Sequence, residues 1–301
     1  TGGVLLAGLA TQSTTAQAAT GPSVYLSRSD SVYAIDADTG DEQWRFARNA
    51  TFYSSPTVVN GTVYVGTFES GLHALNSSTG YKRWSFSEGG RSSPNVVNGT
   101  VYFGSRDGII YSLDATTGRE RWNFSTQESI YARSPTVVDG VVYVVGRKSR
   151  ALNASNGVEL WNTSIRGGVR RSSPTVIKNT VYIGGTGGLY ALNATTGDRR
   201  WVYNTTGSAT TPTVATDTVY FGTGSRRADS VSTDGGVYAV NASTGTEEWN
   251  YSTGTGIFSS PTVADDTVYI GGNDNEIRAL NASNGSKEWG YGTATWFDSR
   301  L

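Results

Sequence analysis

The chain has 301 residues, a formal net charge of −1 and no cysteine. A near-neutral charge lacks the basic footprint of nucleic-acid binding proteins, and the missing cysteines exclude disulfides, thiolate metal sites and cysteine nucleophiles. Glycine is abundant, with 38 residues, which suits short strands joined by tight turns.

The first twenty residues differ from the rest of the chain. Residues 2–10 form a short apolar run, and residues 16–18 follow with the small-x-small sequence Ala-Gln-Ala. This order is typical of the apolar core and cleavage region of a secretory signal, and the run is too short to span a bilayer. We therefore predict that residues 1–20 are the remnant of a signal peptide. Residues 21–301 are then an exported domain without a transmembrane segment, in the cell envelope or outside the cell.

From residue 24 onward the chain consists of similar units, and the second unit shows their plan. Four apolar or alternating stretches, at 55–59, 62–66, 71–75 and 83–86, predict four strands. The first stretch begins with a proline near its start, where no ladder donor is needed. Asn-Gly at 60–61 predicts a two-residue hairpin turn, because both residues tolerate a positive φ. Units of about 40 residues with four strands each are typical of β-propeller blades.

A tryptophan marks the outer strand of every unit. Each unit carries the motif Ala/Ser-aliphatic-Asn/Asp-x3-Gly-x3-Trp, and successive tryptophans are 38 to 40 residues apart except for one gap of 48. We interpret these side chains as structural, because a large apolar ring in every repeat is expected to fill the space between adjacent blades. The seven tryptophans are Trp44, Trp84, Trp122, Trp161, Trp201, Trp249 and Trp289.

The two ends of the repeat region differ from its middle. The first unit, residues 24–46, lacks the proline-led strand that opens the later units. Residues 294–299 align with the lead-in to such a strand, so we expect the C-terminus to supply the missing strand and close a ring of seven blades. The alternative is an eight-bladed propeller truncated near Leu301.

The repeat resembles the pyrroloquinoline-quinone-like, or quinoprotein-type, propeller repeat. The resemblance is carried by Ala-Leu-Asn-Ala-Thr-Thr-Gly-Asp-Arg-Arg-Trp at 191–201 and its six relatives, together with the Ser-Ser-Pro-Thr-Val and Val-Tyr-Ile/Val-Gly elements. It covers residues 24–292. It implies an all-β, seven-bladed propeller of four-stranded blades. The family includes quinone-dependent dehydrogenases and the non-enzymatic barrel-assembly lipoprotein BamB.

For the dehydrogenase branch, the resemblance implies a quinone stacked against a disulfide between adjacent cysteines, a calcium ion and an aspartate base. This chain has no cysteine to form that disulfide. No catalytic residue carries over, and we predict no cofactor and no metal. We favour a protein without catalytic activity over an enzyme. A dehydrogenase that uses the quinone and calcium remains the alternative, and a carbohydrate-binding propeller is a second alternative.

The only histidine, His73, stands where sister units have tyrosine, for example Tyr33, Tyr111 and Tyr190. A lone histidine in a tyrosine position is expected to be a surface or packing variant. It has no partners in the sequence that would suggest a metal site or a Ser-His-Asp triad.

Two features are candidate binding regions. In this family the position before each first strand faces the mouth of the central channel, and here arginine and aromatic residues are mixed at and beside it. Such a mixture suits an anionic ligand or a protein partner. The mouth candidates are Tyr53, Arg91, Arg133, Arg170, Arg171 and Phe258. Unit six also carries about eight extra residues in a loop, and loops on a regular scaffold often carry function. The loop candidates are Arg226, Arg227 and Asp229.

We therefore expect an exported, non-catalytic, BamB-like scaffold that binds a protein partner or a small anionic ligand at the mouth, acts as a monomer and does not bind nucleic acid. Asn-x-Ser/Thr sequences in the turns, for example at Asn60 and Asn98, are acceptor sequences for N-glycosylation. Arginine far exceeds lysine, a bias typical of halophilic archaea, although the near-zero net charge argues against an extreme halophile.

Overall fold

The computed structural model describes residues 22–28, 30–48, 50–52, 54–90, 92–128, 134–169, 172–224 and 235–293. Contacts within the chain divide it into two compact units, Thr1–Pro135 and Thr136–Leu301. The described residues form antiparallel strands and no helix, so none of their segments is a helix that could cross a bilayer. The signal-peptide remnant predicted at 1–20 lies outside the described residues. The single domain predicted over 21–301 stays a prediction.

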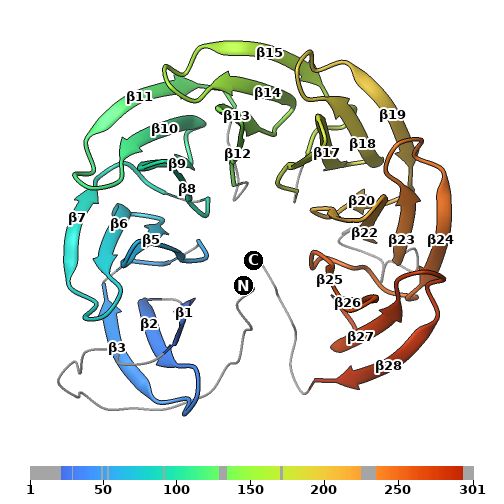
Figure 1. Cartoon of the computed structure of the whole chain (residues 1–301), viewed down its shortest axis with the longest axis horizontal. Coiled ribbons are helices and arrows are strands. Elements are labelled where there is room, and N and C mark those ends of the chain that lie inside the picture. Colours follow the sequence, from blue (N-terminus) through green and yellow to red (C-terminus); the bar gives the residue numbers. More distant parts are fainter. Residues whose placement is uncertain are drawn as a thin grey trace. The chain divides into compact units, whose positions relative to one another are not determined.

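The first unit contains three antiparallel sheets, in which neighbouring strands follow one another in sequence (Figure 1). The first sheet comprises β1 (Ser23–Arg28), β2 (Ser31–Asp36) and β3 (Glu42–Ala47). The second comprises β4 (Thr57–Val59), β5 (Thr62–Thr67), β6 (Gly71–Asn76) and β7 (Lys82–Phe86). The third comprises β8 (Asn95–Val97), β9 (Thr100–Gly104), β10 (Ile109–Asp114) and β11 (Glu120–Ser125).

The second unit contains four sheets of the same kind. The fourth comprises β12 (Thr136–Val138), β13 (Val141–Val144), β14 (Lys148–Asn153) and β15 (Glu159–Ser164). The fifth comprises β16 (Thr175–Ile177), β17 (Thr180–Gly185), β18 (Gly188–Asn193) and β19 (Arg199–Asn204). The sixth comprises β20 (Ser208–Ala209), β21 (Thr213–Ala215), β22 (Thr218–Gly224), β23 (Gly236–Asn241) and β24 (Glu247–Ser252). The seventh comprises β25 (Thr262–Ala264), β26 (Thr267–Gly271), β27 (Glu276–Asn281) and β28 (Lys287–Gly292).

The second sheet shows how closely the repeat specifies its strands. Its four strands fall where the sequence predicts them, although β4 begins at Thr57, because Pro56 has no N–H to donate to the ladder. The turn between β4 and β5 has Asn60 at φ 49° and Gly61 at φ 69°, the left-handed pair that a two-residue hairpin needs. The middle strands β5 and β6 carry the core, and their side chains are buried almost throughout.

Two sheets depart from the four-stranded plan. The first has three strands, in agreement with the missing proline-led strand of the first repeat, residues 24–46. The sixth counts five because its innermost strand is split, with β20 and β21 both pairing with β22. Residues 294–299, which are predicted to complete the first sheet, lie outside the described residues, so ring closure stays a prediction.

Within each unit, the repeat tryptophan joins one sheet to the next. The indole N–H of Trp44 donates to the Ser77 carbonyl at 2.7 Å, and that of Trp161 donates to the Ala194 carbonyl at 2.8 Å. Tyr25 donates its hydroxyl to the same Ser77 carbonyl at 3.1 Å. The ring therefore fills space between two sheets and also fixes the turn of the following sheet. Trp289 in the seventh sheet differs, since 47% of its surface is exposed.

The motif glycine is required by this contact. A Cβ placed on Gly80 would lie 2.6 Å from the ring of Trp44, and one on Gly197 would lie 2.6 Å from the ring of Trp161. Both glycines also have positive φ, 70° and 77°, which side chains with a Cβ rarely adopt. The constant glycine-to-tryptophan spacing thus reflects two requirements, a left-handed turn and an indole ring of the preceding sheet lying directly against it.

Candidate functional site

Most residues predicted at the channel mouth or in the insertion loop lie outside the described residues. They are Tyr53, Arg91, Arg133, Arg170, Arg171, Arg226, Arg227 and Asp229. Their role stays a prediction. Phe258 is described, and it is half-buried next to the fully buried Ile257. Its ring lies against two glycines, because a Cβ on Gly224 or on Gly256 would approach it to 2.7 or 3.0 Å. Phe258 is thus a partly exposed aromatic beside the end of β22.

A repeated hydroxyl contact fixes the residue that follows each of several predicted mouth positions. The N–H of Gly66 donates to Ser54 Oγ at 2.6 Å, and the N–H of Gly271 donates to Ser259 Oγ at 2.9 Å. Equivalent contacts, all to a backbone N–H twelve residues further on, are made by Ser92, Ser172 and Thr210. These short segments are therefore tied to the sheet, which is the kind of rigid support that a binding rim needs.

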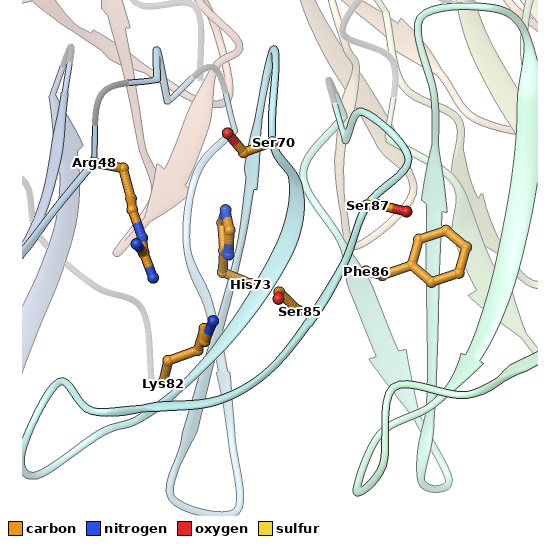
Figure 2. Close-up of a pocket in the computed structure, with 7 residues that line it drawn as sticks. All are labelled: Arg48, Ser70, His73, Lys82, Ser85, Phe86 and Ser87. Atoms are coloured by element: carbon orange, nitrogen blue, oxygen red, sulfur yellow. The ribbon is translucent and has the colours of Figure 1, made fainter.

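A pocket of about 430 Å³ lies in the first unit, where the chain leaves β3 and passes β6 and β7. Figure 2 shows the side chains of Arg48 and Lys82 extending toward the same space beside His73, with Ser85 next to His73. The full lining is Arg48, Ser70, His73, Lys82, Ser85, Phe86 and Ser87. Arg48 also lies over the Phe46 ring, with its Cζ 4.8 Å from the ring centroid.

His73 forms the buried part of this pocket. Only 4% of the residue is exposed, and its ring packs against Phe46 and Phe52 with centroid separations of 5.7 and 6.5 Å. Neither Nδ1 nor Nε2 has a hydrogen-bond partner. Burial, together with the nearby positive charges of Arg48 and Lys82, lowers the pKa of His73 to about 4. The imidazole is therefore neutral at physiological pH.

His73 occupies the third position of the third strand in its sheet, and the other sheets show what that position accepts. Four of them hold tyrosine, and two hold a buried arginine. Arg150 in β14 pairs with Glu159, Nε to Oε2, at 3.2 Å. Arg278 in β27 pairs with both Asp274 and Glu276. A charge at this position is thus matched by carboxylates of the same sheet.

The second sheet reverses the charge that faces this position. Lys82 stands two residues before Trp84, as Glu159 stands two residues before Trp161, and the strand registers are the same. The fourth sheet therefore has an arginine–glutamate pair where the second has a histidine–lysine pair. Sequence reasoning treated His73 as a surface or packing variant and overlooked the pocket. The signal that could have found it was histidine in place of tyrosine at position 73 together with lysine in place of glutamate at position 82. The seventh sheet also replaces both residues, with Arg278 and Lys287, but there Asp274 and Glu276 pair with the arginine.

Whether the chain could hold a quinone and a calcium ion can be judged from the side chains that would bind them. The described residues contain no group of three or more His, Asp or Glu side chains arranged to hold a metal ion. The sequence also has no cysteine for the disulfide against which the quinone stacks in the enzymes that the repeat resembles. The residues that the structure describes do not fit this cofactor pair, and no catalytic step is derived through it.

Comparison with family models gives one match that runs along almost the whole chain. The model described as outer membrane protein assembly factor BamB matches residues 6–129, 73–234 and 227–295. No curated protein matches the sequence.

Solved structures show the same fold at low sequence identity. BamB from Moraxella catarrhalis is similar with a TM-score of 0.73 and 22% identity, over 90% of this chain and 83% of that one. The computationally designed Ika8 protein has a TM-score of 0.78 and 17% identity, over 94% and 88%. Quinohemoprotein alcohol dehydrogenase from Comamonas testosteroni has a TM-score of 0.59 and 19% identity, over 71% of this chain but 45% of the enzyme. The predicted fold class, an all-β protein of seven propeller blades, is confirmed.

Proposed function

The chain belongs to the family of the outer membrane protein assembly factor BamB, and from this premise we propose that it is an exported, non-catalytic propeller that binds protein partners in the cell envelope. The observation that carries the proposal is the family match, which extends from residue 6 to residue 295. The name of the family describes an assembly factor, and a factor that assembles other proteins acts by binding them.

The structural matches do not choose between a binding protein and an enzyme. The chain corresponds to 83% of the Moraxella BamB structure and to less than half of the Comamonas dehydrogenase, but it also corresponds to 77% of a europium-containing methanol dehydrogenase. Since all these identities are below 25%, the structural likeness bears on the fold alone. The preference for a binding protein over a dehydrogenase therefore depends on the family match and on the cysteine-free sequence.

The mouth of the propeller is the proposed contact surface. Its described member, Phe258, is an aromatic side chain held partly exposed on a rigid edge, and aromatic side chains are enriched where proteins bind one another. The arginines predicted beside it would add charge-assisted hydrogen bonds to carboxylates of a partner. Export to the envelope, with residues 1–20 as the signal remnant, forms part of this proposal.

A photocrosslinking experiment tests the proposal. We would place a benzophenone amino acid at Phe258 and, as the matched control, at Tyr81, an aromatic residue in a turn of the second sheet that is 73% exposed. After irradiation of cells of the source organism, we expect one defined adduct with an envelope protein from position 258 and none from position 81. Equal labelling from both positions, or no adduct from position 258, would contradict partner binding at this surface.

A second measurement separates the proposal from the enzyme alternative. Purified protein is titrated with pyrroloquinoline quinone and Ca²⁺ while tryptophan fluorescence is followed, and the same sample enters a dye-linked alcohol and sugar oxidation assay. We expect no saturable quenching and no turnover. Tight saturable quenching with turnover would replace the scaffold proposal by a dehydrogenase that holds its quinone without a disulfide.

A further inference from the structure

The pocket around His73 combines a buried polar side chain without hydrogen-bond partners and two nearby cations. The imidazole is 96% removed from solvent, since 4% of the residue is exposed, yet neither ring nitrogen has a hydrogen bond. Buried polar groups are nearly always hydrogen-bonded, so an unpartnered one calls for an explanation, such as a bound ligand.

The two cations beside the ring have no carboxylate of their own. Among the described residues, neither Arg48 nor Lys82 forms an ion pair, whereas Lys178, Arg121 and Lys287 do. The acidic residues on the flanking turns are engaged elsewhere. The Asp30 carboxylate accepts from Ser31 Oγ at 3.1 Å, and the Glu69 carboxylate accepts from the Thr51 N–H at 2.9 Å.

Hydroxyl groups complete the lining. Ser70, Ser85 and Ser87 are exposed and line the pocket, and Figure 2 shows Ser85 next to His73, whereas the Ser87 hydroxyl points away from it. Hydroxyls, an ammonium and a guanidinium are the side-chain donors that bind phosphate and sulfate groups, because they supply several hydrogen bonds together with positive charge. The pocket volume of about 430 Å³ is large enough for such a group as part of a small molecule.

We propose that this pocket is a binding site for a small oxyanion, a phosphate or sulfate group, which Arg48 and Lys82 hold at its rim above the buried His73. Burial, together with these two cations, keeps the imidazole unprotonated, and the bound anion neutralises the cations. His73 then becomes easier to protonate, and a ring N–H, which the neutral imidazole also carries, can donate toward the ligand. The site shares no residue with the predicted mouth and does not depend on the proposed scaffold function.

The single histidine makes a direct test possible, because its ring gives one Cε1–H signal in a proton–carbon NMR spectrum. The full chain is titrated at constant ionic strength with inorganic phosphate or sodium sulfate, and with sodium chloride as the control salt. We expect a saturable shift of the His73 signal with phosphate and sulfate and none with chloride. We also expect the pKa of His73 to rise when either oxyanion is bound.

Variants identify the residues that bind. Arg48→Gln and Lys82→Gln each remove one proposed cation, and each is expected to weaken oxyanion binding by about tenfold or more. Arg83→Gln is the matched control, because it removes the same charge from the neighbouring residue of β7, whose guanidinium instead donates to the Gly61 carbonyl at 3.1 Å. Arg83→Gln should bind like the unchanged protein.

Three results would overturn the proposal. One is the absence of a saturable shift with either oxyanion. Another is an equal shift with chloride, which would show general screening. The third is equal weakening by Arg83→Gln and Lys82→Gln, which would show dependence on net charge alone. The three variants can be compared as folded proteins, since Arg48, Lys82 and Arg83 are exposed and circular dichroism verifies the fold.

Discussion

The second and fourth sheets carry the same position in opposite electrostatic states. In the fourth sheet, Arg150 is buried and charged, and Glu159 two residues before the tryptophan neutralises it. In the second, His73 is buried, and the residue in the place of Glu159 is Lys82. The comparison shows that one backbone geometry accepts a buried charge where a carboxylate of the sheet pairs with it, as Glu159 does for Arg150, and holds a neutral imidazole where the nearby charges are cations.

The tryptophan contact to the following sheet is the same in both sheets. In both sheets the tryptophan N–H donates to the carbonyl of the following sheet's turn, at 3.0 Å for Trp84 and 2.8 Å for Trp161. The two sheets therefore share this contact, and they differ in the pair His73 and Lys82 as against Arg150 and Glu159. The shared contact and the two pairs can be changed separately.

Removing the tryptophan contact should have the largest effect on stability, and the effect should be similar in the two sheets. Trp84→Ala and Trp161→Ala each remove a ring packed between two sheets, and each is expected to lower the free energy of unfolding by about 4 kcal/mol. Urea unfolding followed by circular dichroism measures both losses. A loss in one sheet more than twice the loss in the other would show that the frames are not equivalent.

Acidification should destabilise the protein through His73. The pKa of the folded imidazole is about 4 and that of an unperturbed histidine is 6.5, so the unfolded chain binds the proton first as the pH falls. The stability that His73 contributes is complete above pH 6.5 and is lost as the pH falls toward 4, by up to about 3 kcal/mol.

The matched variant for this prediction is His73→Tyr, which installs the residue of the sister sheets. Unfolding midpoints are measured for both proteins across this pH range. The variant should lack this part of the acid destabilisation. Identical pH profiles for the two proteins would show that His73 titrates normally in the folded state.

Reversing the charge that faces Arg150 should have a smaller but specific effect. Glu159→Lys leaves a mostly buried guanidinium opposite a cation and is expected to cost about 2 kcal/mol, reduced from that of a fully buried pair because Glu159 is partly exposed. Glu42→Lys is the control, because it stands at the same repeat position in the first sheet, where the slot holds Tyr33. A comparable loss in the control would assign the effect to the outer strand itself.

Transplanting the pair should have the smallest net effect. His73→Arg alone places an arginine opposite Lys82 and is expected to destabilise the second sheet by about 2 kcal/mol. Adding Lys82→Glu recreates the pair of the fourth sheet and should restore about 1 kcal/mol or more, as measured by a double-mutant cycle. Additive losses would show that the two positions do not interact.

The sequence was sufficient to predict the strands and the tryptophan between neighbouring sheets. The Asn-Gly turns, the alternating strands and the glycine-to-tryptophan spacing are local patterns, and each is tied to a backbone conformation or to one repeated contact. They also showed that the first repeat lacks a proline-led strand of its own, and its sheet has three strands among the described residues. The predicted mouth residues other than Phe258 lie outside the described residues, so their arrangement stays a prediction.

The pocket was not predictable in the same way. Lys82 is brought near His73 by strand pairing that contains a register shift between Ala74 and Leu75, and Arg48 comes from the end of a strand in the preceding sheet. A shift of one residue in a strand pairing changes which side chains face each other, so the sequence alone does not determine this neighbourhood. The repeat showed from the sequence that His73 replaces a tyrosine, but only the strand registers showed which side chains surround it.

The most direct test of the account is the titration of the single histidine by NMR in the unchanged protein and in Lys82→Glu. We expect a His73 pKa of about 4 in the unchanged protein and a clearly higher value in the variant, where a carboxylate replaces the Lys82 ammonium near the ring. A pKa near the unperturbed 6.5 in both proteins would contradict it. It would mean that neither burial nor the charges of Arg48 and Lys82 control the protonation of His73.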